Sequence, residues 1–228
     1  MLFVVGVPIG HPDDMTVRAL SILRQVDIIA SEDPAATRLL LSHHGIDRPL
    51  TSYGPSHLKE KVSVLIHRLQ RGARIALVSE CGSPVIADPG CLLVAAAHTH
   101  GIRVISVPGP SALTAAVAAA GLSGDSFFFQ GQLPETKALL KRCLANLLSN
   151  QTATVAFCTK QSLIPVLMTI TEIAPQRSVT LACDLTKQNE MIIRGRARQV
   201  QHIVVLDSAH TIQDVTLIFA GRKTREKK

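Results

Sequence analysis

The chain has 228 residues, of which 46% are hydrophobic and 18% are charged, and its formal net charge is +7. This balance suits buried parallel strands and excludes a disordered protein. Aromatic residues make up only 3% of the chain, so it has little material for a platform that stacks single-stranded bases.

Neither a membrane span nor a secretory signal is expected. The longest nearly apolar stretch, 112–121, is about half of the roughly 20 residues that a spanning helix needs. The first five residues include no basic residue, and Gly6 and Pro8 follow them directly, unlike the start of a secretory signal. The five cysteines form no C-x-x-C pair, which favours a reduced, cytoplasmic protein without a metal site.

In the first half, short apolar runs alternate with amphipathic stretches. The pattern predicts, in chain order, strand 2–7, helix 15–25, strand 26–30, helices 37–44 and 59–71, strand 74–78, helix 91–100, strand 104–107 and helix 111–120. Gly45, Gly72 and Gly101 each follow the end of a predicted helix, a position at which glycine is common. Alternation of this kind indicates an α/β fold with a parallel sheet and right-handed crossovers.

The rhythm changes after Gly121. The pattern of the second half predicts two helices and five short strands. The helices are 137–148 and 163–173, and the strands are 126–129, 154–157, 178–182, 190–194 and 215–219. We therefore expect an N-terminal parallel α/β domain with helices on both faces and a smaller C-terminal mixed α/β domain. The predicted division is 1–112, 113–221 and a basic tail, 222–228, which holds five basic residues and one acidic residue.

Three loops rich in glycine and proline each follow a predicted strand directly. In an open α/β sheet, ligands bind beyond the carboxyl ends of the strands, so these loops are expected to meet at one edge. None of them is a G-x-G-x-x-G or Walker loop, which favours a ligand without phosphates. The loops are Val7-Pro8-Ile9-Gly10, Ser79-Glu80-Cys81-Gly82-Ser83-Pro84 with Asp88-Pro89-Gly90, and Pro108-Gly109-Pro110-Ser111-Ala112.

At these loops, and at Ser31-Glu32-Asp33 with Thr37-Arg38, the sequence resembles the tetrapyrrole methylase superfamily. Within it, the resemblance is closest to members that methylate ribose 2′-hydroxyls of small-subunit ribosomal RNA. It implies S-adenosylmethionine as cofactor, a homodimer and no membrane. Carried over by position, the cofactor contacts are Pro8, Glu80, Gly82, Ser83, Pro108, Ser111 and Ala112, and in the second domain Cys158, Thr159, Leu185 and Asp214.

Methyl transfer to a hydroxyl also needs a proton acceptor near the point of attack. The catalytic candidates are Asp33, Arg38 and Lys187. Each has a structural alternative: Asp33 as a helix N-cap before Pro34, Arg38 as a surface partner of Glu32, and Lys187 as a solvated lysine. A second basic feature, Arg194, Arg196 and Arg198, alternates as on one strand face and suits either a polyanion or an exposed edge.

The sequence thus predicts a methyltransferase that acts on ribosomal RNA. Two alternatives remain open. The first is a methyltransferase of the same fold with a small, tetrapyrrole-type acceptor. The second is a non-catalytic relative that binds the cofactor. It is suggested by Ala35, Ala36 and Thr159, which replace polar groups that the family carries at these positions.

Overall fold

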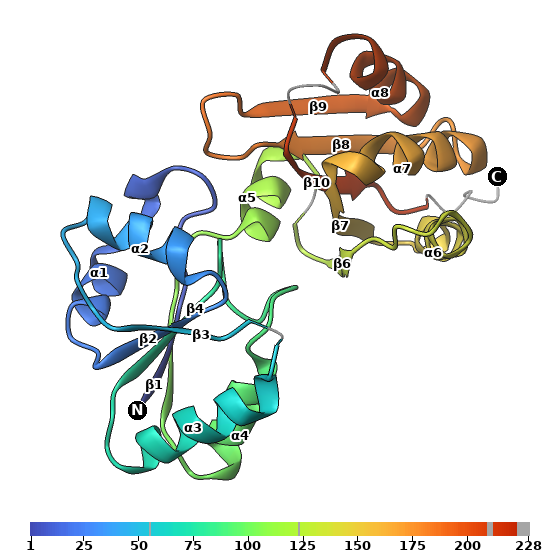
Figure 1. Cartoon of the computed structure of the whole chain (residues 1–228). Coiled ribbons are helices and arrows are strands. Elements are labelled where there is room, and N and C mark those ends of the chain that lie inside the picture. Colours follow the sequence, from blue (N-terminus) through green and yellow to red (C-terminus); the bar gives the residue numbers. More distant parts are fainter. Residues whose placement is uncertain (55, 123, 209–211, 223–228) are drawn as a thin grey trace. The chain divides into compact units, whose positions relative to one another are not determined.

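The computed structural model describes residues 1–54, 56–122, 124–208 and 212–222. The chain divides into two compact units, Met1–Ser111 and Ala112–Lys228 (Figure 1). In the predicted tail, residues 223–228 lie outside the described residues.

The first unit is built on a five-stranded sheet in the order β3-β2-β4-β1-β5, with every neighbouring pair parallel. The strands are β1 (Leu2–Val5), β2 (Ile28–Ser31), β3 (Leu50–Ser52), β4 (Ile75–Val78) and β5 (Val104–Val107). The helices are the 3-10 turn η1 (Pro12–Asp14), α1 (Val17–Leu23), α2 (Pro34–His43), α3 (Leu58–Gln70) and α4 (Cys91–Thr99).

Helices cover both faces of this sheet. Successive residues of a strand point to opposite faces, and β1 divides in this way: Leu2 joins the core under α3 and α4, whereas Phe3 and Val5 join the core under α1 and α2. Figure 1 shows the two helix pairs on opposite sides of the strands. The predicted parallel α/β architecture is confirmed.

Besides the short turn η1, the sequence pattern did not predict strand β3 in this unit. It has only three residues, it lies at the sheet edge beside β2, and all three are partly or fully exposed. A short edge strand needs no apolar run, so hydrophobic periodicity gave no signal. Helix α2 begins three residues earlier than predicted, because Asp33 caps it and Pro34 occupies its first position.

The second unit holds a mixed five-stranded sheet in the order β6-β7-β10-β8-β9. Strands β6 and β7 are parallel, and the other neighbours are antiparallel. The strands are β6 (Phe127–Gln132), β7 (Ala153–Thr159), β8 (Ser178–Cys183), β9 (Met191–Arg196) and β10 (Asp214–Phe219). The helices are α5 (Ala112–Ala119), α6 (Lys137–Ser149), α7 (Lys160–Ile173), α8 (Ala197–Ile203) and the π-helical turn η2 (Val204–Ser208).

The prediction missed α8, and this changes the interpretation of the arginine series. Strand β9 ends at Arg196, so Arg194 and Arg196 share a strand, but Arg198 lies in α8. The expected alternation of three arginines on one strand face is therefore wrong. The short helix buries only Ala197 and Val200, too few apolar positions to produce a helical period in the sequence. Within the described parts of the chain, no helix is long and apolar enough to cross a membrane.

Candidate functional site

The first and second glycine-proline loops of the first unit are joined through their backbones. The Val7 amide donates to the Gly82 carbonyl at 2.9 Å, and the Gly82 amide donates to the Pro8 carbonyl at 3.2 Å. The buried Ser79 hydroxyl also donates to the Gly82 carbonyl, at 3.1 Å. Gly82 has φ +74°, a conformation that favours glycine.

The third loop lies against the other two. A Cβ atom on Gly109 would stand 2.7 Å from the Gly6 carbonyl oxygen, so the two backbones approach as closely as glycines allow. The Ser83 hydroxyl donates to the Pro110 carbonyl at 3.4 Å. The predicted convergence of the three strand-end loops is therefore confirmed.

Carboxylates gather at the same strand ends. Burial, followed by the negative charges of Glu32 and Glu80, raises the pKa of Asp88 to about 6. Burial and then the charge of Glu80 also raise the pKa of Glu32. The charge of Glu80 thus disfavours ionisation of both Glu32 and Asp88, and a bound cation would relieve this repulsion.

The catalytic candidates of the first unit lie beside this edge, after β2. Oδ1 of Asp33 accepts the amides of Ala35 at 2.8 Å and Ala36 at 3.1 Å, which confirms the N-cap role. The Asp33 Oδ2 atom receives no hydrogen bond from the described residues. Arg38 is exposed on α2, and the described residues contain no ion pair between it and Glu32.

In the second unit, the structure brings several predicted residues to one end of the sheet. Thr159 pairs with Asp214 in the β7–β10 register, and Cys158 lies opposite Val215, which pairs with Cys183 on the far side. Thr159 caps α7 by accepting the Ser162 amide at 3.3 Å. Burial, then the neighbouring Cys183, raises the pKa of Cys158 to about 12, so its thiol is not a nucleophile.

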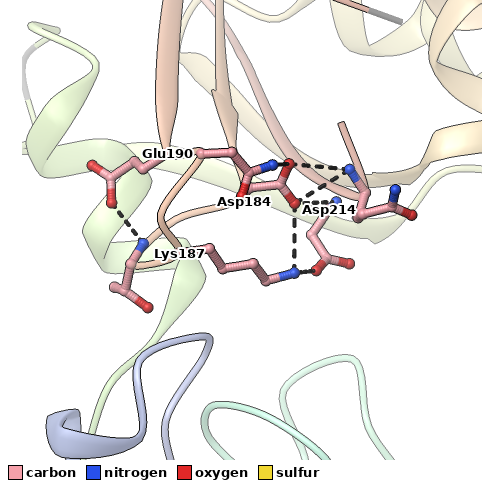
Figure 2. Close-up of polar contacts among 7 residues, drawn as sticks. Asp184, Lys187, Glu190 and Asp214 are labelled. Atoms are coloured by element: carbon pink, nitrogen blue, oxygen red, sulfur yellow. Dashed lines mark hydrogen bonds and ion pairs between the residues drawn. The ribbon is translucent and has the colours of Figure 1, made fainter. Parts of the chain in front are cut away.

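A buried carboxylate organises the loop that follows β8 (Figure 2). Asp184 is 1% exposed and accepts the amides of Gln213 and Asp214 at 3.1 Å and the side-chain amide of Asn189 at 2.8 Å. The same loop holds Asp184 and Thr186 at φ +48° and +65°. Thr186 donates its amide to Glu190 Oε2 at 2.6 Å. These bonds stabilise a backbone shape that side chains normally avoid.

Lys187 is held between two carboxylates in this network. Its ammonium lies 3.5 Å from Asp184 Oδ1 and hydrogen-bonds to Asp214. Burial lowers the pKa of Lys187, but the hydrogen bond and charge of Asp214 and the charge of Asp184 outweigh it, and the pKa is raised. Lys187 is therefore protonated at neutral pH and suits the role of a positive charge rather than that of a base.

Sequence reasoning did not single out three of these residues as functional. Glu32 and Asp88 stand in the quoted motifs, but only the strand order β2-β4 brings Glu32 near Glu80. Asp184 was missed because nothing local marks it as buried. Across the described residues, no group of three or more His, Cys, Asp or Glu side chains is arranged to hold a metal ion.

Two α/β units, with converging strand-end loops in the first, define a ligand-binding enzyme architecture. Residues 1–201 match the model of the tetrapyrrole (corrin/porphyrin) methylases. The chain belongs to this family and is a methyltransferase.

Relatives agree with this assignment, and a solved structure shares the fold. The chain is 37% identical to the ribosomal RNA small subunit methyltransferase I of Thermotoga maritima, over 97% of this chain and 99% of that protein. It is 35% identical to the protein of the same name from Pasteurella multocida, over 99% and 81%. Uroporphyrin-III C-methyltransferase from Thermus thermophilus, solved with S-adenosyl homocysteine, shares the fold, with a TM-score of 0.64, 15% identity and 96% coverage of both chains.

Proposed function

We propose that this protein transfers a methyl group from S-adenosylmethionine to a ribose 2′-hydroxyl of small-subunit ribosomal RNA. The observation that carries the proposal is the 37% identity, over nearly the full length of both chains, to a ribosomal RNA small subunit methyltransferase I. The converging loops of the first unit lie at the strand ends, where α/β enzymes bind their ligands.

The residues present fit this cofactor. S-adenosylmethionine carries a sulfonium and an ammonium, and the carboxylates of Glu32, Glu80 and Asp88 favour a cation. Where Gly6 approaches Gly109, backbone carbonyls and amides are the polar groups. We assign cofactor contacts to Pro8, Glu80, Gly82, Ser83, Pro108, Ser111 and Ala112 in this region, and to Cys158, Thr159 and Leu185 in the second unit.

The bound cofactor supplies an electrophilic methyl group, and the attacking hydroxyl must lose its proton as the carbon–oxygen bond forms. We propose that Oδ2 of Asp33 accepts this proton, because Oδ1 is already engaged in capping. Exposed Arg38 would hold a substrate phosphate as a charge-assisted pair. Lys187, protonated and held by Asp184 and Asp214, would contribute a positive charge.

Labelled methyl transfer to purified small ribosomal subunits tests the proposal. We expect label in the RNA, and we expect the labelled linkage to resist alkali, since a 2′-O-methyl group removes the nucleophile of alkaline cleavage. Label in a tetrapyrrole acceptor, with none in RNA, would assign the small-molecule activity instead. Cofactor binding by calorimetry without transfer to any acceptor would identify a non-catalytic relative.

The role of Asp33 has its own test. Asp33→Asn keeps an oxygen that caps α2 but removes the base, so we expect kcat to fall about 100-fold with an unchanged cofactor Kd. Asp33→Ala also loses the cap and serves as the comparison for stability. If Asp33→Asn kept the wild-type kcat, Asp33 would not be the base, and another group would have to accept the hydroxyl proton.

A cytoplasmic location and a homodimer complete the proposal. The location follows from ribosomal RNA as substrate. The dimer is supported by large apolar side chains exposed around α8 and η2, at Ile203, Val205 and Leu206, which are 38%, 53% and 64% exposed. Light scattering of the purified protein gives the mass, and a monomer at micromolar concentration contradicts the dimer.

A further inference from the structure

Three arginines surround one cavity at the end of the second sheet that is opposite to Lys187. The cavity, of about 380 Å³, is lined by the turn before β8, the end of β9 and the segment after β10. Strand β8 has six residues and runs from Ser178 at this cavity to Cys183, next to Asp184 (Figure 1). The two ends are therefore roughly 17 Å apart along the strand. The arginines that line the cavity are Arg177, Arg196 and Arg222.

Arg177 is the structural member of the group. It is half-buried, and its guanidinium donates to the carbonyls of Ala220 and Leu148, both at 2.8 Å. Burial, and next the positive charge of Arg222, lower its pKa. These carbonyls occupy two of the five N–H groups of Arg177. Because the carbonyls are neutral, they leave the charge of the guanidinium without a counter-ion.

The other two arginines are exposed at the rim. Arg196 donates one hydrogen bond, from Nη1 to the Gln176 carbonyl at 2.8 Å. Arg222 follows Gly221, whose hydrogen atoms face the backbone of residue 151: a Cβ atom on Gly221 would stand 1.8 Å from the Gln151 carbonyl oxygen. This close contact, with the 2.7 Å bond from the Arg222 amide to the Asn150 carbonyl, directs Arg222 to the cavity.

The three charges are not neutralised by the protein that the structure describes. None of the ion pairs among residues 1–54, 56–122, 124–208 and 212–222 involves Arg177, Arg196 or Arg222. Two lysines of the same unit do have carboxylate partners: Lys141 pairs with Glu172, and Lys187 with Asp184 and Asp214. Arginines without counter-ions around a cavity are the arrangement that binds phosphate.

We propose that this cavity, the arginine seat of Arg177, Arg196 and Arg222, binds a backbone phosphate of the ribosomal RNA substrate at a distance from the methylated ribose. The sequence supports RNA over a free phosphate, since Arg222 leads into residues 223–228, four of which are basic and one acidic. A seat that grips the phosphate backbone adds affinity without reading bases. This inference rests on the proposed function.

The test uses the full-length protein with Arg196→Gln and Arg222→Gln, singly and together, and with small-subunit ribosomal RNA as the probe. Arg177 is left intact because it ties two carbonyls of the fold. Loss of this single-strand phosphate contact in the double variant is expected to reduce the slope of log affinity against log salt by about 0.7 and to weaken binding roughly 4-fold at 0.15 M salt. We expect KM for RNA to rise in the double variant and kcat to stay unchanged.

The matched control is Arg68→Gln with Arg71→Gln, which removes the same charge from α3 and its C-terminal cap in the first unit, where Asp27 lines the neighbouring cavity. An equal loss of affinity in the control would reduce the effect to net charge and overturn the seat. Wild-type affinity in the Arg196/Arg222 double variant would overturn it as well. Inorganic phosphate that binds the wild type at millimolar concentration but leaves RNA affinity unchanged would identify a free-ion site and also contradict the proposal.

The two proposals fail in different ways. If the wild type transfers label to small subunits and the double variant behaves like the control, only the arginine seat is lost. If the wild type transfers no label to RNA, the proposed function itself fails, whatever the variants bind.

Discussion

The two units differ in the contacts and charges at the ends of their sheets. In the first unit, backbone atoms join the loops, Val7 with Gly82 and Gly6 with Gly109, and serine hydroxyls add two hydrogen bonds to backbone carbonyls. The charges there, Glu32, Glu80 and Asp88, repel one another. In the second unit, side chains make the contacts, and the buried Asp184 is compensated by amides and by Lys187. The first unit is thus preorganised for a cationic ligand, whereas the second neutralises the charge of Asp184 within its own network.

The largest effect is expected from removing the carboxylate that organises the second unit. Asp184→Ala leaves the partly buried amides of Gln213 and Asp214 and the charge of Lys187 without this buried acceptor, so the free energy of unfolding should fall by about 3–4 kcal/mol. Urea denaturation measures it. Glu80→Ala, an exposed carboxylate of the first unit, is the control and should change stability little. Equal losses in the two variants would abolish the contrast between the units.

A methyl group at the closest backbone approach of the first unit should be nearly as damaging. In Gly109→Ala the new Cβ meets the Gly6 carbonyl at 2.7 Å, and since neither backbone has room to yield, we expect a loss of about 2–3 kcal/mol and much weaker cofactor binding. Calorimetry and urea unfolding give both values. Gly101→Ala is the matched control: nothing lies within 4 Å, and only its φ of +65° costs about 1 kcal/mol. Intact cofactor binding in Gly109→Ala would show that loop contact is dispensable.

Asp88 should reveal the repulsion at the first unit's strand ends through pH. Its folded pKa of about 6 lies above the ordinary aspartate pKa of 3.8, so the stability it contributes is complete below pH 3.8 and is lost as pH rises through 6. Asp88→Asn removes this loss, and the variant should gain about 1 kcal/mol over wild type at pH 8 relative to pH 4, after allowance for solvent screening.

The same substitution should weaken cofactor binding above pH 6, because the cluster loses a negative charge that attracts a cation. Thermal unfolding and calorimetry at pH 4, 6 and 8 separate the two effects. A stability difference that does not vary with pH would show that neither burial nor the charges of Glu32 and Glu80 raise the pKa of Asp88.

The smallest effect is expected at a helix cap of the second unit. Thr159→Ala removes the acceptor for the Ser162 amide and should cost about 1 kcal/mol, whereas Thr159→Ser retains the hydroxyl and should restore most of it. Thermal unfolding of both variants makes the comparison. A Ser variant as unstable as the Ala variant would assign the loss to the missing methyl group rather than to the cap.

The sequence anticipated the first unit better than the second. Four of its five strands are runs that a doubly covered parallel sheet makes apolar, and its loops carry glycine and proline, which signal their own conformations. The second unit depends on residues without a local signal. Nothing near Asp184 marks it as buried, and the short α8 reads as a continuation of β9, which led to the wrong placement of Arg198.

By itself, the sequence determined the α/β class, the parallel sheet, the three strand-end loops and the N-cap at Asp33, because each depends on neighbours within a few residues. Tertiary structure alone decided that Gly6 meets Gly109, that Glu32, Glu80 and Asp88 share one electrostatic environment, and that Arg177, Arg196 and Arg222 line one cavity. These contacts join residues far apart in the chain. They depend on strand order and register, which local propensity does not specify.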